Sequence, residues 1–388
     1  MTLPVPWRPL TLAVVIVSLG TQPVFLLGAG YVQMGREFGF SATGLGVITS
    51  TFWLTAAVVS PLAGRVVQRI GWQRSMKVNA LGAIVVLIAI AVGARSTITL
   101  ALMLMASGVM YSFANPSANL ALAESVDPHR RALTFGLKHA GIPFSTLLAG
   151  LAVPLLIVSF GWRWAFVAAT ALGVVVLALV PSRQAPQSSV KRVEDPRRAL
   201  VPLTRKRLIT MAVGISLAAW AATALTTYLV AAATETGYSE SAAGFLLFGG
   251  SIASIAGRVS AGHVTDKLGS RGFAGIATMA ATGAIAFALL TMTSGTLFAA
   301  LVLVAFATGW GWPGLMTYAV VNANLGSVAA SSAIPQAGVF VGTATAPLVL
   351  GWVADTWSFS ATWGVVAVAL TLSAVIITRV GRAAIAAR

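Results

Sequence analysis

Three basic side chains lie inside long apolar segments of this chain, where a charge is rare and costly: Lys138, His139 and Arg258. Ionisable residues in such segments usually mark a functional site. No carboxylate accompanies them in mid-segment, and Glu124 follows an apolar run instead of lying within one. A carboxylate that leaves water needs a cationic partner, and an arginine can hold it with two parallel hydrogen bonds. These residue types therefore indicate a site for a small organic anion.

Each of these bases also has a simpler interpretation. A long basic side chain near the end of an apolar segment can extend to the water interface, which would explain Lys138 and Arg258 without a ligand. His139 follows Lys138 directly, and neighbouring helical residues differ in direction by about 100°, so the two cannot point into the same cavity. Histidine titrates near neutral pH and could carry a proton, or it could be a neutral packing residue.

Neutral polar and aromatic residues in other apolar segments are the second group of candidates. They could contact a substrate, but polar side chains also join membrane helices by hydrogen bonds, and tryptophan and tyrosine also anchor helices at the interface. The candidates for substrate binding are Gln22, Tyr31, Tyr111, Asn115, Trp310, Trp312 and Gln336.

The elements that carry these residues are predicted to be membrane-spanning helices. The chain has 388 residues, of which 57% are hydrophobic and only 9% charged. Soluble domains carry roughly 25% charged residues. The apolar runs are long and apolar on all sides, unlike the short alternating strands of a membrane barrel. The sequence therefore predicts an all-α polytopic membrane protein with about twelve spans of about 20 residues each.

The spans divide into two sets of six. They are expected near residues 10–34, 43–62, 76–94, 98–122, 132–160 and 164–180, then 208–233, 241–260, 272–293, 296–323, 328–353 and 361–380. This division predicts a first bundle over 1–180, a basic cytoplasmic linker over 181–207 and a second bundle over 208–388.

Basic residues are distributed unevenly among the predicted loops. Every second loop is basic, whereas the loops between them hold only Arg36, Arg95 and Arg163. By the positive-inside rule both termini are cytoplasmic, and we expect a multi-pass protein of the bacterial inner membrane. The same distribution explains the net charge of +16 as a topology signal, so no nucleic-acid partner is expected. We expect a monomer.

Enzymatic chemistry finds no support in the residue pattern. The chain has no cysteine, and its three histidines are dispersed at His129, His139 and His263. A membrane enzyme would need a nucleophile with a base, or a metal-ligand cluster. No glycine-rich run matches a phosphate-binding loop. We therefore expect no enzyme, no metal and no cofactor.

The two halves repeat each other at an offset of 198 residues. Two six-helix bundles in the same orientation are related by an axis along the membrane normal, an architecture that places a solute site near the midplane between them. At an offset of 197, His139 to Ile142 corresponds to Gln336 to Val339. The glycines and serines that match at 198 are Gly39, Ser41, Gly46, Gly64 and Gly71 with Gly237, Ser239, Gly244, Gly262 and Gly269.

The ends of this repeat resemble the loop motif of the major facilitator superfamily. In that motif a glycine is followed by an acid, a base, a second glycine and further bases. The resemblance implies that the motif glycines allow close helix approach and that its charged residues latch the cytoplasmic face. The first copy departs from the pattern with Gln68 in place of the acid, which implies a neutral hydrogen bond there. The gating residues implied are Gly64, Gln68, Arg69 and Gly71, and Gly262, Asp266, Lys267, Gly269 and Arg271.

Three segments are also similar to the monocarboxylate and oxalate–formate branch of that family: 37–41, 60–64 and 258–262. This similarity implies an alternating-access carrier for a monocarboxylate, with Arg258 binding the substrate. Coupling by proton symport through His139, uniport and anion exchange all remain open. The alternative is efflux of drugs or amphipathic metabolites. Such carriers often hold a buried carboxylate in the first spans, and between Leu10 and Trp53 only Glu37, in a loop, is acidic.

Overall fold

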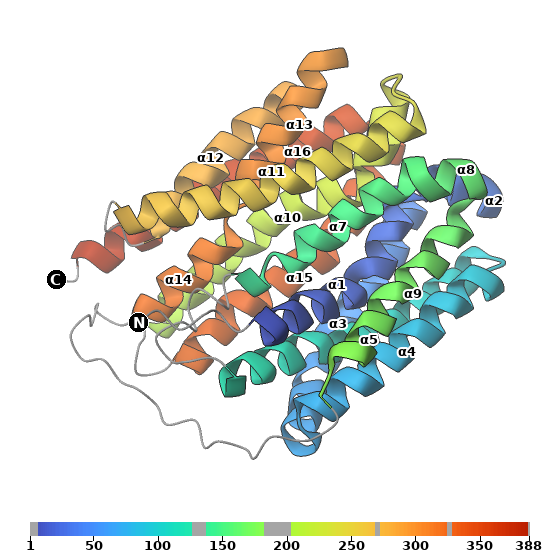
Figure 1. Ribbon diagram of the computed structural model, residues 1–388. Helices are drawn as coiled ribbons and strands as arrows, with labels where there is room; N and C mark the ends of the chain where they lie inside the picture. The colour runs from blue at the N-terminus through green and yellow to red at the C-terminus, as the bar shows by residue number, and fades with distance from the viewer. Residues whose placement is uncertain (1–6, 126–136, 182–202, 268–271, 324–327, 387–388) are drawn as a thin grey trace. The chain divides into compact units, whose positions relative to one another are not determined.

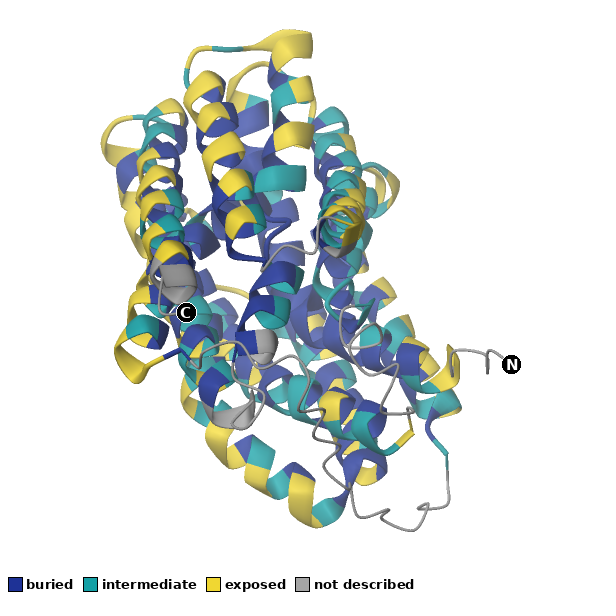
Figure 2. Ribbon diagram, turned by 90° about the vertical axis from the view of Figure 1, so that its left-hand side faces the viewer, coloured by how far each residue is buried: buried dark blue, intermediate teal, exposed yellow. Residues whose placement is uncertain are grey.

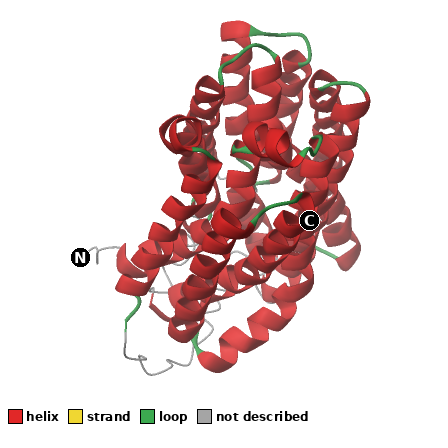
Figure 3. Ribbon diagram, turned by 90° about the vertical axis from the view of Figure 1, so that its right-hand side faces the viewer, coloured by secondary structure: helices red, strands yellow, loops and turns green. Residues whose placement is uncertain are grey.

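The computed structural model describes residues 7–125, 137–181, 203–267, 272–323 and 328–386, and these residues form helices joined by short loops (Figure 3). No strand occurs within the described ranges. Twelve of the helical segments are long and apolar enough to cross a membrane, by length and composition. The predicted all-α fold with twelve spans is therefore confirmed.

The chain forms two compact units, Met1–Phe40 with Thr51–Val193, and Ser41–Ser50 with Glu194–Arg388. In the first unit, α1 packs against α5, α7 and α9, and α4 packs against α5 and α9. Its helices, labelled in Figure 1, are α1 (Trp7–Ala29), α2 (Tyr31–Phe38), most of α3 (Ala42–Ile70), α4 (Trp72–Gly93), α5 (Thr97–Ser125), α7 (Gly141–Ala152), the π-helical turn Val153–Ile157, α8 (Val158–Phe160) and α9 (Trp162–Leu179).

In the second unit, α10 packs against α15 and α16, α12 packs against α13 and α16, and α11 packs against α13. Its helices are α10 (Arg205–Glu235), α11 (Glu240–Lys267), α12 (Phe273–Leu290), α13 (Gly295–Gly309), α14 (Pro313–Ala323), α15 (Val328–Thr356) and α16 (Phe359–Ala386).

The first helix of each unit is its most buried span. The most apolar part of α1 is 89% buried and that of α10 is 61% buried, whereas the other ten spans lie between 33% and 56%. Those other helices carry large exposed apolar side chains, such as Val58, Val92 and Ile98 (Figure 2). Exposed apolar side chains are favourable where the surrounding solvent is lipid and unfavourable where it is water. Each unit is thus built around one central helix.

Three predicted spans differ from the observed helices. The first ends at Ala29, so Tyr31 lies in the short helix α2 and not in a span. Helix α2 ends at Gly39, whose φ of +70° is the left-handed conformation that favours glycine. The predicted fifth span, 132–160, begins partly outside the described residues, and a turn at 139–140 precedes α7.

The predicted tenth span, 296–323, is broken into α13 and α14. The break covers Trp310 to Trp312, and α14 begins at Pro313. Proline has no N–H to donate and clashes with the preceding turn, so it is favoured at the first position of a helix and not inside one. The predicted span is confirmed, since residues 295–320 cross as one segment, but the break within it leaves backbone carbonyl groups without partners within α13.

Candidate functional site

Lys138 is buried in the first unit between neutral amide side chains. Its exposed fraction is 4%, and it lies just before α7. The ammonium donates hydrogen bonds to Oδ1 of Asn115 at 3.1 Å and to Oδ1 of Asn119 at 2.8 Å. Both asparagines belong to α5, where a spacing of four residues places them on one face. Among the described residues, the buried charge is therefore held by side chains of α5.

The same face of α5 extends the hydrogen-bonded network by one more turn. The amide nitrogen of Asn115 donates to the hydroxyl oxygen of Tyr111 at 2.9 Å. The Tyr111 ring lies 5.6 Å from the rings of Phe52 and Trp53, which close this end of the network with apolar surface. The result is a ladder of polar groups along α5, from Tyr111 to Asn119, with one positive charge.

Lys138 has one donor more than its partners use. A lysine ammonium has three N–H groups. Two are used by Asn115 and Asn119, and within the part of the chain that the structure describes no carboxylate pairs with Lys138. A buried charge without a counter-charge is unfavourable. This geometry can bind an anion, which would accept the third hydrogen bond and neutralise the charge.

Arg258 is the corresponding base of the second unit, and it has a different environment. It is half-buried in α11, and its guanidinium donates to the backbone oxygen of Trp310 at 3.0 Å. The guanidinium carbon also lies 5.2 Å from the centroid of the Trp310 ring, within the range of a cation–π interaction. The helix break at Trp310 supplies both contacts, so the break positions the arginine.

Close packing of α11 on α13 brings Arg258 to this break. A Cβ atom at the preceding residue, Gly257, would collide with the backbone of Ala307. Ser254 lies four residues before Arg258, and Trp312 lies two residues after Trp310. The hydroxyl of Ser254 and the indole nitrogen of Trp312 are buried and have no hydrogen-bond partner among the described residues. Ser254 precedes Arg258 by one helical turn and shares its face of α11. These groups can donate to a ligand.

The remaining candidates are Gln22, Tyr31, His139 and Gln336. Gln22 accepts a hydrogen bond from Ser145 at 2.6 Å and thereby joins α1 to α7, which favours its alternative role in helix packing. Tyr31 packs on Phe40 with ring centroids 5.7 Å apart. His139 and Gln336 are half-buried. Ser145 and Ser254 were missed.

Gly64 and Gly262 show no close helix contact with the described residues. A Cβ atom at either position would meet no described atom within 4 Å, so the expected close approach at these two glycines stays a prediction. Close approach occurs at other glycines, including Gly141 against Val14 and Gly338 against Ala212.

The other motif residues lie at helix ends. Gln68, Arg69 and Lys267 are exposed there, and Gly71 adopts a φ of +81° between α3 and α4. The side chain of Asp266, and Gly269 and Arg271 as a whole, lie outside the described residues. The latch therefore stays a prediction.

An ion pair joins Glu37 of α2, which lies outside the spans, to Arg163 at the start of α9. Glu37 accepts from both terminal nitrogens of Arg163, at 3.0 and 2.6 Å, and from the indole nitrogen of Trp162 at 2.8 Å. The hydrogen bond from Arg163 lowers the pKa of Glu37, opposed by partial desolvation. Both side chains are about 40% exposed, so the pair belongs to the surface of the first unit.

Twelve helices among the described residues, each long and apolar enough to cross a membrane, define a polytopic membrane protein. The chain belongs to the major facilitator superfamily, whose family model matches residues 10–334 and 211–384. It is accordingly a transporter and not an enzyme.

Solved structures agree with this fold. The chain is similar to a bacterial homologue of the human lysosomal transporter Spinster in its inward-facing, unoccupied conformation, with a TM-score of 0.73 and 14% identity over 97% of this chain and 96% of that one. The inward-facing, occupied conformation gives the same score and identity over 100% and 97%. At this identity the similarity shows the fold alone. No curated protein matches the chain.

Proposed function

We propose that this protein is a secondary active transporter of a small organic anion, such as a monocarboxylate, and that it works by alternating access. The observation that carries the proposal is the ammonium of Lys138, which is 4% exposed and held by two neutral amides. Its third N–H can donate a hydrogen bond to a carboxylate oxygen. Its positive charge, which no described carboxylate neutralises, can balance the negative charge of the substrate.

Arg258 supports the same substrate class in the second unit. Its guanidinium is positioned by the backbone oxygen and the ring of Trp310, and a guanidinium has the planar geometry that can donate two parallel hydrogen bonds to a carboxylate. Asn115 contacts Lys138, Trp310 contacts Arg258, and Tyr111 contacts Asn115. These three residues are the proposed polar neighbours of the substrate. Gln22, Tyr31, Trp312 and Gln336 remain further candidates.

Coupling and topology complete the proposal. His139 is the proton carrier if transport is a symport, and anion exchange is the alternative. The unequal distribution of loop bases supports an inner-membrane protein of bacteria with both termini in the cytoplasm. The motif from Gly262 to Arg271, which begins inside α11, is proposed to latch the cytoplasmic face. We propose that the protein functions as a monomer.

Uptake into proteoliposomes tests the proposal. Labelled monocarboxylates and dicarboxylates are compared with the neutral amides of the same carbon skeletons, in wild type, Lys138→Ala and Arg258→Ala. We expect carboxylate uptake in wild type and its loss in both variants, whereas Arg95→Ala, which removes an exposed loop base, retains it. A pH gradient that drives uptake indicates symport, and stimulation by an internal anion indicates exchange. Full carboxylate uptake in both variants would refute the anion site.

The alternative of efflux gives a different result. Cells that express the protein and survive toxic lipophilic cations better than an empty-vector strain, with no carboxylate uptake in proteoliposomes, would assign it to drug efflux.

A further inference from the structure

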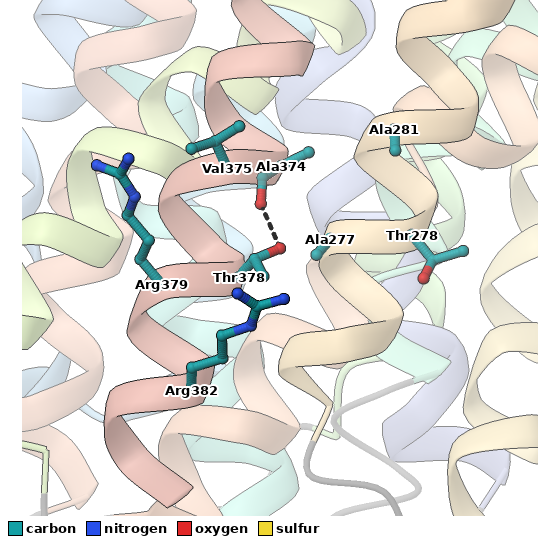
Figure 4. A pocket seen from close by; sticks show the side chains of 8 residues that line it. All are labelled: Ala277, Thr278, Ala281, Ala374, Val375, Thr378, Arg379 and Arg382. Carbon is teal, nitrogen blue, oxygen red and sulfur yellow. Dashed lines mark hydrogen bonds between the residues drawn. The ribbon is translucent and has the colours of Figure 1, made fainter. Parts of the chain in front are cut away.

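A groove with two arginines lies between α12 and α16 of the second unit. Its volume is about 450 Å³, and it is open on one side. Figure 4 shows the two helices running side by side with the lining side chains between and in front of them. The groove is lined by Ala277, Thr278, Ala281, Ala374, Val375, Thr378, Arg379 and Arg382.

The two arginines carry charge that the described part of the protein does not neutralise. Arg379 and Arg382 are exposed, and no ion pair or hydrogen bond joins either side chain to another described residue. Both lie at the end of the last span, Phe359–Arg382, where a membrane helix reaches the headgroup region. A guanidinium matches the geometry of a phosphate, to which it can donate two parallel hydrogen bonds.

Apart from the hydroxyl groups of Thr278 and Thr378, the rest of the groove is apolar. Its walls are formed by small side chains, Ala277, Ala281 and Ala374, together with Val375. The hydroxyl of Thr378 donates to the backbone oxygen of Ala374 at 2.7 Å, so it offers no donor to a ligand. A soluble anion would use only the basic end of such a groove. A ligand with a phosphate at one end and a hydrocarbon chain at the other would use all of it.

We propose that this groove binds an anionic phospholipid, with the headgroup phosphate on the arginines and an acyl chain along the alanine walls. In Figure 4 the Arg382 side chain extends toward Ala277 of α12, whereas Arg379 lies on the other flank of α16. Arg382 is therefore the main phosphate ligand and Arg379 the weaker one. Basic pockets between membrane helices bind anionic lipid headgroups by this chemistry. The site is separate from the substrate site proposed above.

Native mass spectrometry of the full-length protein in detergent tests this site. Phosphatidylglycerol is compared with phosphatidylcholine of identical acyl chains and with glycerol phosphate, which lacks them. We expect wild type to retain phosphatidylglycerol in preference to both. Arg382→Gln should weaken this binding about fivefold, which corresponds to about 1 kcal/mol for one base at an anionic surface. Arg379→Gln should weaken it less, and the double variant most.

Two further variants separate a lipid site from a general effect of charge. Arg74→Gln removes an exposed base from α4, and it should bind lipid as wild type does. Ala281→Trp fills the groove at an exposed position while it keeps both arginines, and it should weaken binding of phosphatidylglycerol severalfold.

Three outcomes would overturn the proposal. Unchanged phosphatidylglycerol binding in the double variant would show that the arginines do not form the site. Binding of phosphatidylcholine as strong as that of phosphatidylglycerol would show that the negative charge of the lipid headgroup does not contribute to binding. Binding of glycerol phosphate as strong as that of the lipid, and insensitive to Ala281→Trp, would assign the groove to free anions. Each variant alters exposed side chains, and a circular dichroism spectrum identical to wild type verifies folding.

Discussion

Lys138, just before α7, and Arg258, in α11, are the bases singled out in the two units, yet the protein holds them in different ways. Lys138 is bound by side-chain oxygens of an unbroken helix, α5, and retains an N–H without an acceptor among the described residues. Arg258 is bound by a backbone oxygen and an aromatic ring at the break between α13 and α14. The first arrangement depends on two amide side chains and the second on backbone conformation.

This difference indicates separate tasks for the two bases. A flexible ammonium with a spare donor can adjust to an anion that arrives and leaves. The guanidinium of Arg258 lies on the ring of Trp310 at the break between α13 and α14. Its position therefore depends on the conformation of that break. We infer that Lys138 contributes most to affinity, whereas Arg258 couples the ligand to the conformation of α13 and α14.

The largest expected effect comes from replacing Arg258 with an unbranched side chain that carries no charge. Arg258→Met should lower transport about 30-fold or more, because a buried polar partner is lost. Arg258→Lys keeps the charge but loses the planar stacking and the paired donors, and it should lower transport about tenfold. Initial rates of carboxylate uptake in proteoliposomes measure both. Equal rates for Arg258→Lys and wild type would show that the contact with Trp310 is unimportant.

The next effect concerns the packing that brings Arg258 to the helix break. Gly257→Ala should destabilise the protein by about 1–3 kcal/mol, because its new methyl group would collide with the backbone of Ala307. Gly262→Ala lies in the same helix but faces open space. It should be neutral or stabilise the helix by about 0.5–1 kcal/mol. Thermal unfolding in detergent measures the pair, and equal melting temperatures for both variants would contradict the packing described here.

A smaller effect is expected at the amides that hold Lys138. Asn115→Leu should cost about 1–3 kcal/mol of stability, because it leaves a buried ammonium with one acceptor and removes the partner of Tyr111. Asn119→Leu should cost less, since Asn119 is exposed and water can replace it. Chemical unfolding of the two variants measures the difference. A larger loss at Asn119 than at Asn115 would reverse the proposed order.

The smallest effect is expected at the surface pair of Glu37 and Arg163, in contrast to Lys138 and Arg258. The pKa of Glu37 is lowered in the folded protein. Its contribution to stability is therefore present above the pKa of the unfolded state and is lost as the pH falls through the lower, folded pKa. Both side chains are partly exposed, so Glu37→Gln should cost no more than about 1 kcal/mol near pH 7.

Thermal unfolding between neutral and acidic pH measures this contribution. The wild-type and Glu37→Gln curves should converge at the acidic end. A gap between them that widens as the pH falls would contradict the sign of the pKa shift.

The fold was largely predictable because lipid imposes long apolar helices on the sequence. The bases at Lys138 and Arg258 were also recognisable, since a charge in an apolar run is conspicuous. Their partners were harder to predict. Asn119 could be inferred from its spacing with Asn115, but the contact of Arg258 with Trp310 depends on a helix break that only Pro313 signals.

The glycines show the limit of inference from motifs. Gly64 and Gly262 match the loop motif, yet no described atom lies close to either. Gly257 is not part of the motif, but it lies against the backbone of Ala307. Whether a glycine permits close approach depends on which helix lies opposite, and that is a property of the tertiary structure. For the same reason Tyr31 could not be assigned to α2 instead of the first span.

The most direct test of the account is the affinity of the purified protein for a monocarboxylate, measured by isothermal titration calorimetry in wild type, Lys138→Met and Lys138→Arg. We predict that Lys138→Met raises the dissociation constant about 30-fold or more, whereas Lys138→Arg, which keeps the charge, raises it by less than about tenfold. A dissociation constant for folded Lys138→Met equal to that of wild type would contradict the central claim that the buried ammonium binds the substrate.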